Sequence, residues 1–227
     1  MEGRMTEIVG LTGCALVDAL ERIEADSAEA HSLDVNEVAG AIDPKDLGKD
    51  DVRRLLTALG RLAESAPAFD LRKVDPVRFA NLVARASRTQ LESVVAERPL
   101  RERVLREIFD RMGAHIRQDR AKTLHAVVHW RLSGGTGDGG YDRYETVISH
   151  GECTVSRPEV RLPAEGPSAP RKEKPRVTIT IAPVDFFRLI THQATPAVLF
   201  VTGKIKVKGD LAFAAGLIGF FDLPKPS

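Results

Sequence analysis

The sequence predicts an α+β protein with helices throughout the first half of the chain and mixed strands and helices in the second. Two observations predict this class. Apolar residues recur at helical spacing up to about residue 119, and beyond it they alternate or gather in short β-branched runs. The charge divides similarly, with 13 Lys plus Arg and 18 Asp plus Glu in residues 1–98, against 20 and 14 in residues 99–227. An acidic helical region is therefore expected at 1–98, followed by a basic α+β domain at 99–227.

The composition is that of a globular protein. The chain has 227 residues, of which 43% are hydrophobic and 29% charged, which is enough to bury a core and unlike collagen or disordered chains. The net charge of +1 argues against a surface built for nucleic acid, so no nucleic-acid partner is expected. Residues 211–221 are the most apolar stretch, but a spanning helix needs about 20 residues. With no signal-peptide pattern at the start, we expect a cytoplasmic protein.

Four helices are expected before residue 119. The first covers residues 11–25, and the second follows Asp50, which can cap a segment with leucines at helical spacing. The third starts at Asp75 and Pro76, a typical cap and first-turn pair, and continues to a break at Pro99. The fourth begins with Pro99 in its first turn.

The rest of the chain is predicted to alternate between short strands, helices and loops. Two strands flank the glycine-rich residues 133–140, and a long proline-rich loop separates them from the later elements. His150 is interpreted as a turn residue and His192 as a helix end. The expected elements are strands at 124–132 and 144–155, a loop at 157–176, a strand at 177–183, a helix at 183–192, a strand at 200–210 and a helix at 211–221.

No motif for a metal, a cofactor or a catalytic group stands out. Cys14 and Cys153 are far apart and lack the spacing of a zinc site, and residues 133–140 lack the Lys and Ser/Thr of a phosphate-binding loop. His125 and His129 are four residues apart, which on a strand only places them on the same side. We therefore predict no catalytic residue, no metal and no cofactor, and favour a binding protein over an enzyme.

Three lysines alternate near the C-terminus. Lys204, Lys206 and Lys208 should project from one face of a strand, with Ile205 and Val207 turned inward. A solvated strand face explains this pattern best, and no aromatic residues interleave with the lysines to stack on bases. A weak contact with an anionic membrane surface is a further hypothesis.

The aromatic residues point to a site. Six of the nine phenylalanines lie between Phe186 and Phe221, and residues 211–221 are apolar around nearly the whole helix. Such a helix is either buried in an ordinary core or lines an apolar cavity. The candidate lining residues are Phe186, Leu189, Ile190, Phe200, Phe213, Leu217, Ile218, Phe221 and Trp130.

The stretch from VTITIAPVDFFRLITH to GKIKVKGDLAFAAGL resembles the signature end of the sterol carrier protein type 2 family, and the resemblance extends over roughly residues 99–223. It implies a five-stranded sheet covered by helices around an apolar tunnel, with a sterol, fatty acyl chain or other lipid as ligand and no cofactor. Two departures are Thr191 and His192, where the family commonly has Gly-Lys, and a long proline-rich loop. Residues 1–98 are not covered, and His31, their only histidine, cannot supply a His-rich metal site.

Three functional hypotheses remain. The first is non-enzymatic binding or transfer of a hydrophobic small molecule in the apolar cavity. The second is an enzyme, such as an isomerase or cyclase, that acts on a hydrophobic molecule with His125, His129, Asp185 or Tyr144 as acid or base. The third makes the N-terminal helices a contact for a homodimer or a protein partner.

Overall fold

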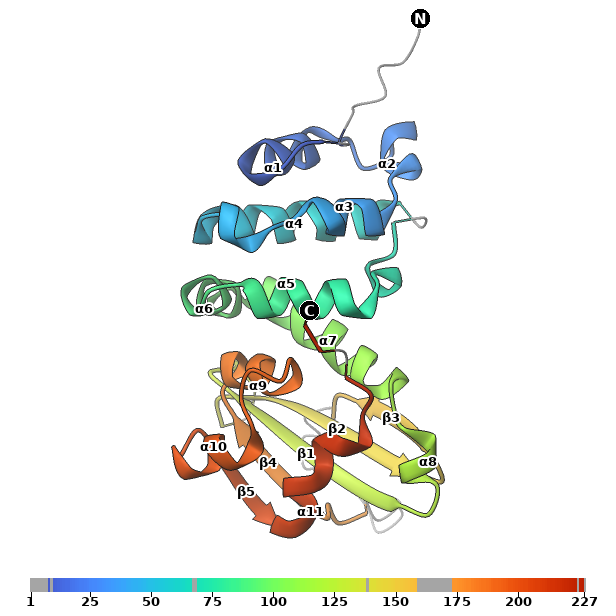
Figure 1. The fold of residues 1–227 in the computed structure, drawn as a ribbon, viewed down its shortest axis with the longest axis vertical. Coiled ribbons are helices and arrows are strands. Elements are labelled where there is room, and N and C mark those ends of the chain that lie inside the picture. Colours follow the sequence, from blue (N-terminus) through green and yellow to red (C-terminus); the bar gives the residue numbers. More distant parts are fainter. Residues whose placement is uncertain are drawn as a thin grey trace, which may run out of the picture. The chain divides into compact units, whose positions relative to one another are not determined.

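The computed structural model describes residues 8, 10–66, 69–137, 139–158, 173–223 and 225–226. The chain divides into two compact units at Val104 and Leu105, inside helix α7 (Arg98–Ala114). The first is called the helical unit and the second, which ends at Leu223, the mixed unit (Figure 1). Most of the predicted proline-rich loop, residues 159–172, lies outside the described residues.

The helical unit is built around α4, its longest helix before α7. On α1, Leu16, Val17 and Leu20 are at most 1% exposed, and Leu62 of α4 is fully buried in the same cluster. Arg61 of α4 donates to the carbonyl oxygens that end α1, at 2.7 to 3.1 Å. The elements are α1 (Gly13–Arg22), α2 (Ala28–Ser32), α3 (Val35–Ala41), the 3-10 turn η1 (Pro44–Asp46), α4 (Lys49–Ser65), the 3-10 turn η2 (Leu71–Lys73), α5 (Pro76–Arg85) and α6 (Arg88–Ala96).

The helix starts confirm one predicted cap and correct two details. Asp75 accepts a hydrogen bond from the backbone N–H of Arg78 at 2.9 Å, as expected of a cap. Asp50 is not a cap, because α4 begins at Lys49 and the N-cap residue is Gly48, so that Asp50 lies inside the helix. The single helix predicted up to Pro99 is wrong, since α5 ends at Arg85 and Ser87 caps α6 through a capping box with Gln90.

Gln90 ties α6 to the turn before α4. Its side-chain amide donates to the carbonyl oxygens of Pro44 and Leu47, both at 2.7 Å, while its side-chain oxygen accepts from the N–H of Ser87. Since Gln90 is 6% exposed, its removal takes a buried hydrogen-bond partner from the carbonyl oxygens of Pro44 and Leu47. We expect Gln90→Ala to lower the free energy of unfolding of the helical unit by about 2–4 kcal/mol.

Urea unfolding followed by circular dichroism measures this loss, because helices dominate the signal. The matched control is Gln193→Ala, which removes one hydrogen bond between exposed Gln193 and Thr191 at 3.0 Å. The control should lose less than about 1 kcal/mol. Equal losses in both variants would contradict the role given to Gln90.

The mixed unit contains a five-stranded sheet in the order β3-β2-β1-β4-β5. Strands β1 and β4 are parallel, and every other neighbouring pair is antiparallel. This confirms the predicted α+β class with a five-stranded sheet. After α7 the elements are α8 (Gln118–Ala121), β1 (His125–Ser133), β2 (Tyr141–Ser149), β3 (Glu152–Ser156), β4 (Val177–Ile181), α9 (Pro183–Ile190), α10 (Pro196–Val201), β5 (Ile205–Gly209), α11 (Leu211–Gly216) and the 3-10 turn η3 (Leu217–Phe220).

Three details of the mixed unit differ from the sequence prediction. The strand expected at 144–155 is two strands, because His150 at φ 53° and Gly151 at φ 88° turn the chain between them. The strand expected from residue 200 starts at Ile205, since residues up to Val201 form α10. The final helix tightens into a 3-10 turn after Gly216.

The two faces of the sheet have opposite character. Alternate residues such as Trp130 on β1 and Ile179 on β4 are at most 2% exposed, and they form the covered face, in front of which α9 and α11 lie in Figure 1. The residues between them form the open face and, apart from buried Val127, are partly or largely exposed. The central residues of the open face are His129, Arg131, Arg143, Glu145, Thr178, Thr180, Lys206 and Lys208.

Candidate functional site

Aromatic rings fill the middle of the covered face. Phe109 of α7 stacks on Tyr144 with ring centroids 4.0 Å apart and on Phe186 of α9 at 5.0 Å. Trp130 meets the edge of Phe109 at 5.8 Å and lies 5.5 Å from Phe186. The indole N–H of Trp130 donates to the hydroxyl of Thr146 at 3.0 Å, which satisfies its one polar atom. These rings hold α7 and α9 against the sheet.

The structure brings most of the predicted lining residues into this apolar layer. Ile218 is half-buried, and Phe200 is 49% exposed on α10, outside the layer. The buried ones are Trp130, Phe186, Leu189, Ile190, Phe213, Leu217 and Phe221.

Helix α10 presents apolar side chains to the surface. Val198, Phe200 and Val201 are 56%, 49% and 86% exposed, whereas Leu199 is buried. The helix is fixed by Pro196 at its first turn and by Thr195, whose hydroxyl accepts from the N–H of Val198 at 3.3 Å. Three exposed large apolar residues on one short helix form a candidate contact for a ligand or a membrane.

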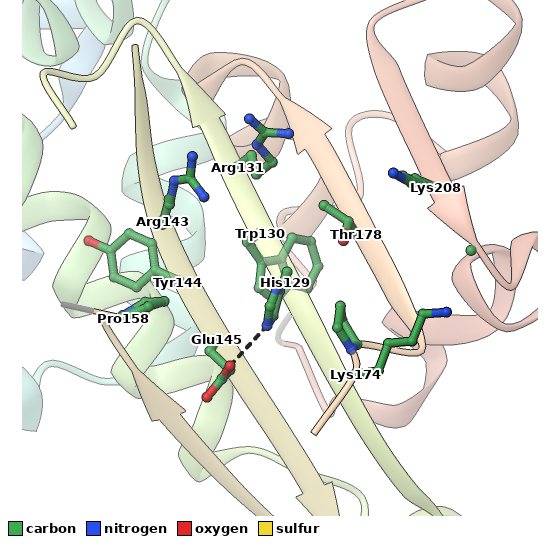
Figure 2. A pocket seen from close by; sticks show the side chains of 12 residues that line it. His129, Trp130, Arg131, Arg143, Tyr144, Glu145, Pro158, Lys174, Thr178 and Lys208 are labelled. Atoms are coloured by element: carbon green, nitrogen blue, oxygen red, sulfur yellow. Dashed lines mark hydrogen bonds and ion pairs between the residues drawn. The ribbon is translucent and has the colours of Figure 1, made fainter. Parts of the chain in front are cut away.

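The open face carries a pocket of about 600 Å³ (Figure 2). Strand register explains how it forms, because paired residues on neighbouring strands point to the same side. Thr178 of β4 pairs with His129 of β1 on one side and with Lys208 of β5 on the other. His129 in turn pairs with Glu145 of β2. The next row places Lys206, Thr180, Arg131 and Arg143 side by side. The pocket is lined by His129, Trp130, Arg131, Arg143, Tyr144, Glu145, Pro158, Lys174, Pro175, Thr178, Lys208 and Gly209.

Positive charge dominates the lining of this pocket. Glu145 is the only carboxylate among the described residues that line it, and its Oε2 lies 2.9 Å from Nε2 of His129, the contact marked in Figure 2. The guanidinium of Arg131 lies 4.4 Å over the ring of Tyr141. Its Nε is buried and has no hydrogen-bond partner within the described part of the chain.

Of the four residues considered as acids or bases, His129 and Tyr144 line the pocket, and His125 and Asp185 do not. His129 lies in the pocket, and His125 of the same strand bonds to Glu173 at 2.9 Å. Asp185 is buried on α9 and lies 3.6 Å from Lys204 Nζ. Tyr144 is buried in the aromatic layer.

The described ranges hold neither a metal-binding cluster nor a membrane-spanning helix. They contain no group of three or more His, Cys, Asp or Glu side chains able to hold a metal ion. None of the helices in those ranges is long and apolar enough to cross a membrane.

Neither cysteine is in a disulfide, and both thiols are hard to ionise. Burial raises the pKa of the Cys153 thiol to about 11, and a hydrogen bond to Asp51 raises the pKa of exposed Cys14. Because the thiolate is the reactive form, roughly a thousandth of Cys153 should be reactive at pH 8. We expect its alkylation by iodoacetamide to accelerate about tenfold per pH unit until pH approaches 11.

Peptide mass spectrometry at a series of pH values measures the rate at each cysteine. The urea-unfolded chain serves as the control, and its rates should level off near the ordinary thiol pKa of about 8.5. A rate at folded Cys153 that levels off at the same pH would contradict the effect of burial.

One protein-family profile matches the sequence of the mixed unit. The sequence profile of the SCP-2 sterol transfer family matches residues 105–222, a little over half of the chain. A search among curated protein sequences found no match.

The solved structures that match this chain include two sterol carrier proteins. Sterol Carrier Protein 2 from Yarrowia lipolytica is 21% identical, with 53% of this chain and 91% of that chain covered and a TM-score of 0.38. The sterol carrier protein domain 2 of Helicoverpa armigera is 22% identical, with 45% and 71% covered and a TM-score of 0.34. The sec-alkylsulfatase Pisa1 from Pseudomonas sp. is 16% identical, with 92% of this chain but 34% of that chain covered and a TM-score of 0.41.

The profile match falls on the mixed unit and includes its five strands and α8 to η3. It thereby confirms the resemblance that the strand–helix pattern from residue 177 onward had indicated. The chain belongs to the SCP-2 sterol transfer family.

Proposed function

We propose that the mixed unit binds and transfers a hydrophobic small molecule, such as a sterol or a fatty acyl chain, without reacting with it. The observation that carries the proposal is the apolar layer between the covered face and helices α7, α9 and α11, within a member of this family. Burying apolar ligand surface gives about 25 cal/mol per Å², so a long acyl chain needs no specific polar partner. Such a layer would accept ligands of related shape.

Helix α10 is the proposed route by which a lipid arrives. Its exposed Val198, Phe200 and Val201 would enter the surface of a membrane, and Lys204 and Lys206 follow directly in the chain. An apolar contact combined with basic residues supports reversible membrane binding, and each lysine near an anionic surface adds about 1 kcal/mol. The charge of β5 thus supports the predicted contact with anionic membranes.

The test is titration of the delipidated full chain with two fluorescent probes, the fatty acid cis-parinaric acid and the sterol dehydroergosterol. Leu217→Trp places a larger side chain in the apolar layer and should weaken probe binding about tenfold, because overpacking costs about 1–3 kcal/mol. The control is Val77→Trp, at an exposed position of α5, which should bind as the unaltered chain does. If neither probe binds, or if both variants bind equally well, the proposal is wrong.

A further inference from the structure

The pocket on the open face points to a second ligand. We propose that it binds a phosphate group carried by a small organic molecule or a lipid headgroup. This proposal does not depend on lipid binding in the apolar layer, because the charged side chains that line the pocket belong to the open face of the sheet.

The first argument is a pair of like charges. Arg131 and Arg143 are directly opposite each other on antiparallel strands, and both line the pocket. Two guanidinium groups in this arrangement can donate together to the oxygens of one anion. The next pair along the strands, His129 and Glu145, is complementary and hydrogen-bonded. The two guanidinium groups therefore lie side by side, one row along the strands from the His129–Glu145 pair.

The second argument is the number and chemistry of the donors. Lys174 and Lys208, both exposed, add two further positive charges, and Thr178 adds a hydroxyl group. Guanidinium groups match the geometry of phosphate oxygens, which they can bind in pairs. Figure 2 shows Arg131 and Arg143 extending from adjacent strands and Lys174 and Lys208 on the other side of Thr178. Donors from several directions suit a group with several charged oxygens.

The third argument concerns Arg131 and the size of the pocket. The buried Nε of Arg131 has no hydrogen-bond partner among the described residues, so it can donate to a ligand. The volume of about 600 Å³ is comparable to that of ordinary small-molecule sites and far exceeds that of a bare phosphate ion. We therefore assign the pocket to a phosphate with an organic substituent.

The experiment uses the full chain at low ionic strength, with two probes that present the same phosphate. Glycerol 3-phosphate, titrated by calorimetry, is the soluble source. Vesicles of equimolar phosphatidylcholine and phosphatidic acid, compared with pure phosphatidylcholine, are the membrane source. We expect Arg131→Gln combined with Arg143→Gln to raise the Kd about tenfold or more, because charge-assisted hydrogen bonds are lost.

The matched control combines Arg106→Gln with Lys122→Gln, which removes the same charge at exposed positions outside the pocket. If the double variant of the two arginines has a lower Tm than the unaltered chain, a second double variant in the pocket, Lys174→Gln with Lys208→Gln, replaces it in the comparison. If glycerol 3-phosphate binds, and only the two double variants in the pocket weaken its binding, the ligand is a soluble phosphate. If only the vesicles with phosphatidic acid bind, and the same two variants weaken that binding, the ligand is a lipid headgroup. Equal weakening by the control pair, or no binding of either probe, overturns the proposal. Binding of cis-parinaric acid should be unchanged in all these variants.

Discussion

Phe109→Ala is expected to lower the free energy of unfolding of the mixed unit by about 3–5 kcal/mol, the usual cost of removing a fully buried ring. Phe109 is 0% exposed and contacts Trp130, Tyr144 and Phe186 at centroid distances of 4.0 to 5.8 Å. Alanine would leave a cavity where α7, α9 and the sheet meet. Urea unfolding followed by fluorescence measures the loss in the mixed unit, because Trp130 is the only tryptophan of the chain.

Phe200→Ala is the matched control for this prediction. The same side chain is removed, but Phe200 is 49% exposed on α10, so the expected loss is below about 1 kcal/mol. If the two variants unfold at the same urea concentration, the stacked rings do not stabilise the mixed unit as argued.

Gly209→Ala is expected to destabilise the mixed unit by more than about 3 kcal/mol, since strain and a steric clash add together. Gly209 has φ +111°, and a Cβ there would lie 2.4 Å from the carbonyl oxygen of Arg176. That carbonyl accepts a hydrogen bond from the N–H of Asp210 at 3.1 Å, so the strand β4 cannot move away without losing it. A thermal unfolding curve gives the change in Tm.

Gly203→Ala separates conformational strain from the clash. Gly203 has φ +69°, and a Cβ there would meet no heavy atom within 4 Å. The only cost of alanine at this position is then that of a non-glycine residue in the left-handed backbone conformation, about 1 kcal/mol of stability. A Tm change at Gly203 as large as that at Gly209 would show that the close approach to Arg176 is unimportant.

Local signals predicted the elements whose ends are fixed by adjacent residues. Asp75 and Pro76 predicted the start of α5, and the apolar residues after Pro183 predicted α9. Helix α10 was missed because Val198, Phe200 and Val201 favour strands. The missed signal was Thr195 followed by Pro196, a cap and a first-turn residue.

The open-face pocket could not be predicted from the sequence. Arg131 and Arg143 alternate with buried residues, which indicates that each lies on the exposed face of a strand. The sequence does not show which residue of a neighbouring strand each one pairs with. Their pairing depends on the register of β1 and β2, and Lys208 joins them only because β4 lies between β1 and β5. The apolar layer was predictable because aromatic residues are concentrated near the C-terminus. The role of residues 1–98 in self-association stays a prediction, which light scattering of the full chain can test.

The parallel pairing of β1 with β4 has a consequence for folding. β1, β2 and β3 are consecutive in the chain and each pairs with the next, so they can form a sheet with short connections. β4 can join only after the chain closes a loop from Ser133 to Val177, and the entropy cost grows by about 0.6 kcal/mol for each doubling of loop length. Contacts of such long range slow folding. We expect the three-stranded part to form first, and β4 and β5 to add to β1 as a later step.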